Sequence, residues 1–174
     1  MLSISVTTRP PRQGETDNKW YHFVSEDEFQ RMVRGEEFLE YACVFGKHSY
    51  GTPKKWLDDA RAQNKDLVLE IDVQGARQVR KKVPESIAIF IVPPSREELE
   101  KRLRARGLDG EGEIRRRLEQ ARLEMEQYVD YDYVVINENL EEAGDAVQAI
   151  ARGARCRTTQ NQDRVRNILK SFGG

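Results

Sequence analysis

The amino-acid sequence predicts an α/β fold built around a parallel β-sheet. Short apolar runs rich in β-branched residues occur at four places, and segments of helix length separate them. Strands of a parallel sheet are buried on both faces, so they appear as continuous apolar runs and not as alternating ones. Helices between strands supply the crossovers that such a sheet needs. The four predicted strands lie at 2–6, 67–73, 87–92 and 133–136.

Serine followed three residues later by glutamate predicts two helix starts, because the two side chains can cap each other's backbone amides. A third start is predicted where threonine precedes proline, since proline suits the first helical position. These pairs are Ser25 with Glu28, Ser95 with Glu98, and Thr52 with Pro53. Gly107 should end the helix begun at Ser95. We also expect a mobile helical hairpin with a glycine hinge at 108–112, an amphipathic helix over 140–155 and a loosely attached terminal helix.

Size and composition indicate one small cytoplasmic domain. The 174 residues carry 29 basic and 30 acidic side chains, so there is no basic excess to attract nucleic acid. Cys43 and Cys156 are far apart, have no metal-ligand spacing with a histidine and occur without a secretory segment, which favours free thiols in a reducing compartment. The apolar runs are too short to span a membrane. We therefore predict no membrane role, no nucleic-acid partner and no protein-bound metal.

Two arginines near the start of the chain have the chemistry of an anion site. Arg9 and Arg12 each present a planar fork of donors suited to phosphate oxygens. The two prolines between them hold the backbone extended, so little order must be gained on binding. An exposed basic turn is the alternative that these residues leave open.

Four segments occur in one order that resembles the guanylate kinase family of nucleoside monophosphate kinases. They are Ser5–Arg12, Glu37–Tyr41, Ser49–Pro53 and Leu69–Gly75, and the resemblance runs from Leu2 to about Arg155. It implies a P-loop kinase-like parallel sheet flanked by helices, with GMP-binding and lid insertions. It also implies a single domain over 1–174, in which 1–8 and 66–95 form the core, 9–65 bind GMP, 96–130 form the lid, and 131–174 form further core and the tail.

The phosphate-binding P-loop of that family is missing from the sequence. A P-loop needs a glycine, four residues and then Gly-Lys-Ser/Thr, whereas Gly46-Lys47 is followed by His48. In the family this loop precedes the arginine segment, so we expect the chain to lack a first strand and helix of roughly thirty residues. An N-terminally truncated enzyme, inactive as it stands, is one explanation. A genuine non-catalytic module is the second, and a nucleic-acid binder is the third.

The resemblance assigns a GMP site to the first half of the chain. Guanine presents an N1–H and an amino group side by side, and one ionised carboxylate can accept both hydrogen bonds. Glu40 matches that carboxylate, although an exposed glutamate is the alternative. Further matched residues contact the base or its surroundings (Ser5, Thr52, Glu70 and Asp72) or bind the phosphate (Arg9, Arg12, Tyr21 and Tyr50). Glu70 and Asp72 alternate along a predicted strand, so both should face the ligand-binding end of the sheet. Tyr21 and Tyr50 could instead be packing residues.

The lid is assigned to the second half of the chain. Arg102 and Arg117 match catalytic arginines that neutralise charge during transfer, while Arg102, Arg106 and Asn137 match residues that bind ATP. Arg102 and Arg106 are four apart and share a helix face. A solvated face of arginines paired with glutamates is the alternative for the lid, and a plain loop residue is the alternative for Asn137.

The function that the resemblance implies is transfer of a phosphoryl group from ATP to GMP, giving ADP and GDP, with Mg²⁺ as cofactor. GMP and ATP are the expected partners, and a homo-oligomer is left open. A non-catalytic module that binds GMP or a phosphorylated peptide is the alternative. Nucleic-acid binding by the arginines of the C-terminal segment is the least favoured reading of the sequence.

Overall fold

The structure is a computed structural model that describes residues 1–44, 47–107 and 110–172. It divides the chain into two compact units, Met1–Ser86 and Ile87–Gly174, which are described separately below as the first and the second unit. The division falls within the predicted core segment 66–95. The expected assignment of 1–174 to one domain stays a prediction.

The first unit is built on a four-stranded sheet with the order β2-β1-β4-β3. Strand β1 (Val6–Thr7) is parallel to β2 (His22–Phe23) and antiparallel to β4 (His48–Pro53), which pairs antiparallel with β3 (Phe38–Val44). A short connection forces β3 and β4 to run in opposite directions, because parallel neighbours need a long crossover. This sheet is therefore mixed, and three of its four strands lie in the segment 9–65, outside the strands predicted for the parallel sheet.

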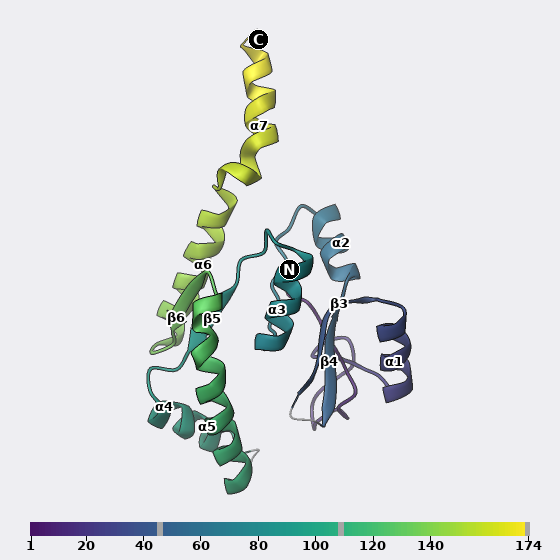
Figure 1. Cartoon of the computed structure of the whole chain (residues 1–174), viewed down its shortest axis with the longest axis vertical. Helices are drawn as coiled ribbons and strands as arrows, with labels where there is room; N and C mark the ends of the chain where they lie inside the picture. Colours follow the sequence, from purple (N-terminus) through teal and green to yellow (C-terminus); the bar gives the residue numbers. More distant parts are fainter. Residues whose placement is uncertain (45–46, 108–109, 173–174) are drawn as a thin grey trace. The chain divides into compact units, whose positions relative to one another are not determined.

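Helix α1 (Glu26–Arg34) begins where the sequence predicts it and covers one side of this sheet (Figure 1). The Ser25 hydroxyl accepts a hydrogen bond from the Glu28 amide at 3.2 Å. The helix buries Phe29, whose ring stacks on Phe38 of β3 with 4.8 Å between ring centroids. Together with Val6 these residues form the core of the first unit.

The remaining helices of the first unit are α2 (Lys55–Ala62) and α3 (Val73–Lys82). The predicted helix start at Thr52 is wrong, because Thr52 and Pro53 end strand β4 and α2 begins two residues later. Thr52 is fully buried opposite Glu40 of β3, and this cross-strand pairing outweighs its local preference for a helix cap. Helix α3 lies on the side of the sheet opposite to α1 (Figure 1).

The strand predicted at 67–73 is not formed as such. The segment makes only an isolated parallel bridge, in which the Ser3 amide donates to Val68 and the Val68 amide donates to Met1. Among the described residues the pairing of these two segments does not extend beyond this bridge. Asp72 instead becomes the N-cap of α3.

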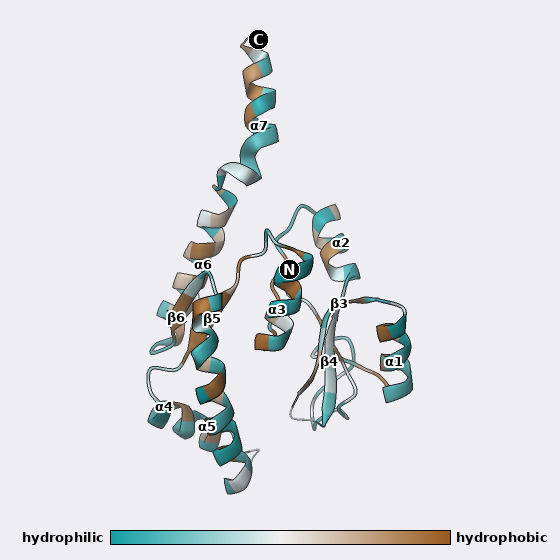
Figure 2. Ribbon diagram, viewed as in Figure 1, coloured by the Kyte–Doolittle hydropathy of each residue, from teal (hydrophilic) through white to brown (hydrophobic). Residues whose placement is uncertain are grey.

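The second unit holds a two-stranded parallel sheet of β5 (Ile89–Val92) and β6 (Tyr133–Ile136), as the sequence predicts. Helices α4 (Arg96–Ala105) and α5 (Glu111–Met125) pack through Leu103, Ile114 and Leu118. Both strands are hydrophobic in Figure 2, whereas α4 and α5 are largely hydrophilic. A 3₁₀ turn (Glu126–Asp130) leads into β6.

Local signals in the second unit act as the sequence predicts. Ser95 caps α4 through the Glu98 amide at 3.2 Å, and Gly107 follows the helix at a φ of +62° that favours glycine. Residues 108 and 109 of the expected hinge lie outside the described residues, as do residues 45, 46, 173 and 174. The chain ends in α6 (Leu140–Arg155) and α7 (Thr158–Ser171). No described helix is long and apolar enough to cross a membrane.

Candidate functional site

Polar side chains are buried in the sheet of the first unit, where a purely structural core would be apolar. Among the described residues the buried polar ones are Thr7, Arg9, Glu40 and Thr52. Arg9 lies in the bend directly after β1, and the others lie in β1, β3 and β4. Burying a polar or charged group is unfavourable unless it gains a partner. This concentration marks the sheet face as a candidate site.

Glu40 lies against the first turn of α3, with only 4% of its surface exposed. A β-bulge between Phe38 and Glu40 interrupts the strand register, so Phe38 packs on α1 while Glu40 approaches α3. The approach is close: a Cβ atom added to Gly75 would lie 2.6 Å from Glu40 Oε2. Gly75 is therefore the residue that gives this carboxylate room.

Burial raises the pKa of the Glu40 carboxyl above its ordinary value. The hydroxyl and amide of Thr52 oppose that shift, the Asp72 carboxylate adds to it, and the Lys82 ammonium lowers the pKa. A carboxylate whose pKa is raised by burial is short of hydrogen-bond donors. A ligand that brings two donors would supply them.

The Thr52 hydroxyl beside Glu40 is also without a partner among the described residues. Its oxygen is fully buried and makes no hydrogen bond of ordinary geometry. The same hydroxyl lowers the pKa of the neighbouring Glu40 carboxyl. An unpartnered buried hydroxyl is uncommon in a finished core. Thr52 and Glu40 thus form a buried polar pair in which the hydroxyl is available to a further partner.

Arg9 is held from several directions near the same sheet. Its Nη2 donates to Glu15 Oε1 at 2.9 Å and its Nη1 donates to the Pro10 carbonyl at 2.8 Å. Its guanidinium carbon lies 5.3 Å from the centroid of the Tyr21 ring. The Glu15 carboxylate, and next the Tyr50 hydroxyl, hold the pKa of Arg9 above its usual value against the opposing effect of burial.

Two predicted phosphate ligands, Tyr21 and Tyr50, meet beside Arg9. Their rings pack edge to face with 5.8 Å between centroids. Burial raises the pKa of Tyr21, and the nearby Tyr50 and Glu70 add to that shift. The structure therefore brings Arg9, both tyrosines and Glu70 into one neighbourhood.

Other predicted residues of the GMP site take part mainly through the backbone or a cap. The Ser5 carbonyl accepts from the His22 amide at 2.9 Å. The Arg12 amide donates to Glu15 Oε2 at 2.7 Å, and the Arg12 side chain is exposed. Asp72 accepts from the amides of residues 74 and 75 at 3.0 and 2.9 Å. Asp72 therefore does not project from a strand together with Glu70, because no strand forms there.

Sequence reasoning missed three residues that shape this neighbourhood: Glu15, Gly75 and Lys82. Glu15 follows Arg12 by three residues, which is turn spacing, and this was the only local signal for its contacts. Nothing local indicates that Gly75 and Lys82 of α3 approach β3. Lys82 Nζ donates to the Phe38 carbonyl at 3.1 Å, and such contacts depend on how the helix packs.

The predicted lid arginines lie in the second unit, where Arg102 and Arg117 are paired with glutamates of their own helices. Arg102 Nε donates to Glu98 Oε1 at 2.8 Å, and Arg117 Nε donates to Glu113 Oε1 at 3.4 Å. Arg106 is exposed at the end of α4. Asn137 directly follows β6, and its backbone amide donates to the Val92 carbonyl at 2.8 Å. The pairing expected of a solvated helix face is thus present for both Arg102 and Arg117.

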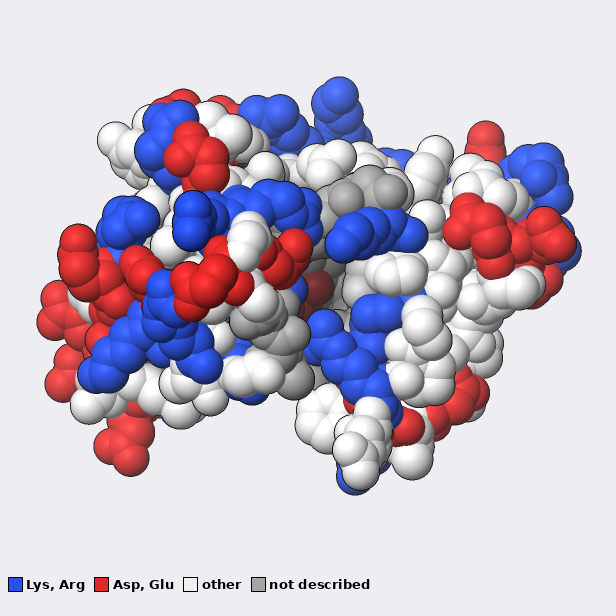
Figure 3. All heavy atoms as spheres, turned by 90° about the horizontal axis from the view of Figure 1, so that it is seen from below, with Lys and Arg blue, Asp and Glu red and all other residues white. Residues whose placement is uncertain are grey.

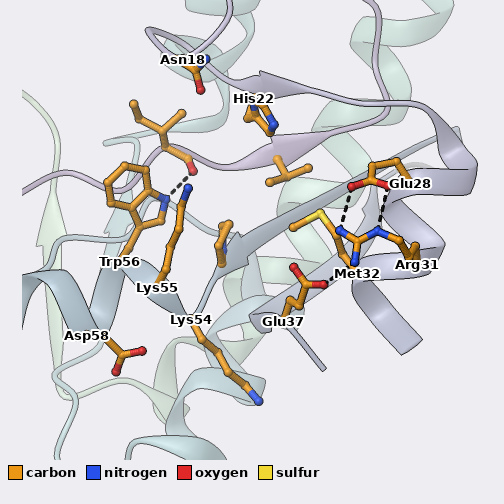
Figure 4. Close-up of a pocket in the computed structure, with 13 residues that line it drawn as sticks. Asn18, His22, Glu28, Arg31, Met32, Glu37, Lys54, Lys55, Trp56 and Asp58 are labelled. Atoms are coloured by element: carbon orange, nitrogen blue, oxygen red, sulfur yellow. Dashed lines mark hydrogen bonds and ion pairs between the residues drawn. The ribbon is translucent and has the colours of Figure 1, made fainter. Parts of the chain in front are cut away.

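A separate cavity of about 410 Å³ lies elsewhere in the first unit (Figure 4). Trp56 at its edge donates from Nε1 to the Ile4 carbonyl at 2.9 Å, and Arg31 forms ion pairs with Glu28 and Glu37 at 2.8 Å each. None of the predicted site residues lines this cavity. It is therefore not the site described above.

The first unit thus combines a buried carboxylate with an arginine and tyrosine cluster, the combination that the resemblance to nucleoside monophosphate kinases led us to expect. A guanylate kinase family model matches residues 1–153. Guanylate kinase from Caldanaerobacter subterraneus subsp. tengcongensis is 47% identical over 162 residues, which cover 93% of this chain and 78% of that protein. Guanylate kinase from Dechloromonas aromatica is 50% identical over 153 residues, covering 88% and 75%. The chain belongs to the guanylate kinase family.

A solved structure agrees with this assignment. The crystal structure of guanylate kinase from Anaplasma phagocytophilum matches with a TM-score of 0.79 and 38% identity, covering 92% of this chain and 78% of that chain. The predicted activity of the family, phosphoryl transfer from ATP to GMP, is confirmed by these matches. They favour the enzyme over a module that only binds nucleotide or peptide.

Proposed function

We propose that the first unit is the GMP site of this kinase and that Glu40 recognises guanine. The observation that carries the proposal is the buried carboxylate of Glu40, which lies beside the unpartnered hydroxyl of Thr52. Guanine would donate its N1–H and amino hydrogens to the carboxylate. Adenine has an acceptor at N1, so AMP would leave the buried carboxylate unsatisfied. Ser5, Glu70 and Asp72 would line the rest of the base and ribose site.

The phosphate of GMP would bind beside Arg9. Arg9 keeps guanidinium donors that Glu15 and Pro10 do not use, and the exposed Arg12 can add a second guanidinium. The hydroxyls of Tyr21 and Tyr50 would donate to phosphate oxygens without adding charge. These arginine and tyrosine donors would stabilise the phosphate charge because they are already held in position before GMP binds.

Arg102 and Arg117 are proposed to neutralise charge on the transferred phosphoryl group, and Arg106 and Asn137 to contact ATP. Guanylate kinases are ATP-dependent, and kinases in general use Mg²⁺ to neutralise the nucleotide phosphates. The described residues hold no group of three or more His, Cys, Asp or Glu that could bind a metal, so we assign no residue to Mg²⁺.

We further propose a cytoplasmic enzyme whose partners are GMP and ATP. On the face shown in Figure 3, acidic and basic side chains lie next to one another, in keeping with the net charge of −1. Cys43 and Cys156 are exposed free thiols, which suits a reducing compartment. The open question of a homo-oligomer can be answered by measuring the sedimentation of the chain.

The proposal is tested by calorimetric titration of the chain with GMP, IMP and AMP. We expect affinity to fall in that order, because IMP retains the N1–H but lacks the amino group. Glu40→Gln should weaken GMP binding by about 10- to 100-fold, since a hydrogen bond to a charged group contributes about 1.5–3 kcal/mol. Glu37→Gln removes the same charge at an exposed position of the same region and is the matched control. Equal wild-type affinities for GMP and AMP would refute the role of Glu40.

A further inference from the structure

Glu15 joins the two proposed phosphate arginines through its two carboxylate oxygens. Oε1 accepts from Arg9 Nη2 at 2.9 Å, while Oε2 accepts from the Arg12 amide at 2.7 Å. The Glu15 amide in turn donates to the Arg12 carbonyl at 3.0 Å and closes a turn. The preceding Gly14 has a φ of +86°, a conformation in which glycine is favoured. Glu15 is therefore folded back onto the segment that carries both arginines.

The contact is well placed to fix the Arg9 side chain. In the ion pair only 10% of the Arg9 side chain and 17% of the Glu15 side chain are exposed. The Tyr21 and Phe23 rings lie 5.3 and 5.8 Å from the guanidinium carbon and leave it little lateral freedom. Glu15 supplies the acceptor that sets the direction of the guanidinium within this aromatic surrounding. Without that acceptor, Arg9 retains its charge but loses its fixed orientation.

We propose that Glu15 is a positioning residue for the phosphate of GMP, holding the Arg9 guanidinium and the Arg12 turn at the separation that the phosphate needs. This inference rests on the proposed phosphate-binding role of Arg9 and Arg12. It concerns a residue that would not touch the reacting atoms. Glu15 acts by preorganisation, because groups that are already ordered lose less entropy when the ligand binds.

Electrostatics alone gives the opposite expectation. A carboxylate close to a bound phosphate repels it, so removal of the Glu15 charge would strengthen GMP binding if charge were its main effect. Positioning predicts weaker binding when Glu15 is removed. The direction of the change therefore distinguishes the two effects.

The experiment compares Glu15→Ala and Glu15→Gln with the wild-type chain by calorimetry, using GMP and guanosine as separate ligands. Glu15→Ala should lower GMP affinity by about tenfold, since charge-assisted hydrogen bonds fix the arginines. The GMP affinity of Glu15→Gln should lie between those of the wild type and Glu15→Ala, because the single amide oxygen of glutamine can replace only one of the two hydrogen bonds. Guanosine affinity should stay unchanged in both variants. Glu85→Gln, which removes an exposed carboxylate paired with Arg61, is the charge-matched control.

Each other outcome has a defined meaning. Unchanged or tighter GMP binding by Glu15→Ala overturns the positioning role. An equal loss of GMP and guanosine affinity also overturns it, because Glu15 would then support the fold and not the phosphate site. If the wild-type chain binds guanosine as tightly as GMP, the proposed phosphate role of Arg9 and Arg12 fails, and this result does not depend on any Glu15 variant.

Discussion

Gly75→Ala is the substitution whose effect on the proposed guanine site follows most directly from the structure. The new Cβ would lie 2.6 Å from Glu40 Oε2, 3.2 Å from Glu40 Cδ and 3.2 Å from the Ile71 Cβ. Glu40 Oε2 would have to move by about 0.8 Å to reach the 3.4 Å at which ordinary contact begins. Glu40 is 4% exposed and lies in a paired strand, so it has little room to retreat.

Two opposing effects set the expected change in stability. Crowding in a packed interior is destabilising by about 1–3 kcal/mol, whereas alanine stabilises a helix relative to glycine by about 0.5–1 kcal/mol. We therefore expect a net loss of about 1–2 kcal/mol in the free energy of unfolding of the first unit. Displacement of the carboxylate should also weaken GMP binding by about tenfold or more.

Urea unfolding followed by tryptophan fluorescence measures the first effect, because both tryptophans, Trp20 and Trp56, lie in the first unit. Calorimetry with GMP measures the second. Gly144→Ala in α6 is the control, since a Cβ at that position meets no atom within 4 Å. The control should retain GMP affinity and gain helix stability in circular dichroism. If Gly75→Ala binds GMP as tightly as the wild type, then GMP binding does not require the close packing of Glu40 against α3, and the reasoning is refuted.

Four further predictions concern the same unit. Burial raises the pKa of Glu40, so the loss of GMP affinity on acidification should begin at a higher pH than it would for an ordinary glutamate, whose pKa is 4.5. Lys82→Met removes a cation that lowers this pKa and should move the loss of affinity to still higher pH. The pKa of Glu40 is higher in the folded chain than in the unfolded chain, so its protonated form stabilises the fold at low pH, and this contribution is lost as the pH rises through the folded-state pKa. At neutral pH, urea unfolding should therefore show that Glu40→Gln is more stable than the wild type. Asp72→Ala removes the N-cap of α3 and should lower the free energy of unfolding by about 1 kcal/mol, whereas serine in Asp72→Ser can still cap the helix. If GMP affinity falls in both variants, the Asp72 carboxylate also contacts the guanine base. Phe29→Ala should cost about 3–5 kcal/mol in urea unfolding, because Phe29 is 1% exposed and stacked on Phe38, and a loss below 1 kcal/mol would contradict its place in the core.

Features that depend on neighbouring residues in the chain were predictable. Ser25 and Ser95 cap helices because a hydroxyl and an amide three residues later are brought together by the helix itself. Gly107 ends α4 for a similarly local reason. The strands at 87–92 and 133–136 were also predicted, since a continuous apolar run favours burial whatever its partner.

Features that depend on a distant partner were predicted less well. The 67–73 segment has the composition of a strand but forms only one bridge, because a strand exists only through the backbone groups that pair with it. Thr52 has the local chemistry of a helix cap, yet its pairing with Glu40 places it in β4. In both cases tertiary contacts outweigh local preference.

The sequence by itself determined which residue types this protein offers to a nucleotide: a carboxylate at position 40, two arginines around a pair of prolines, and two tyrosines. Only the tertiary structure decided how they are used. The bulge after Phe38 brings Glu40 toward α3, Gly75 leaves space for its carboxylate, and Glu15 turns back onto Arg9. Burial and orientation arise from contacts between residues that are not neighbours in the chain. In the proposed site these contacts would make ordinary charged side chains selective, because they remove water from them and fix their directions.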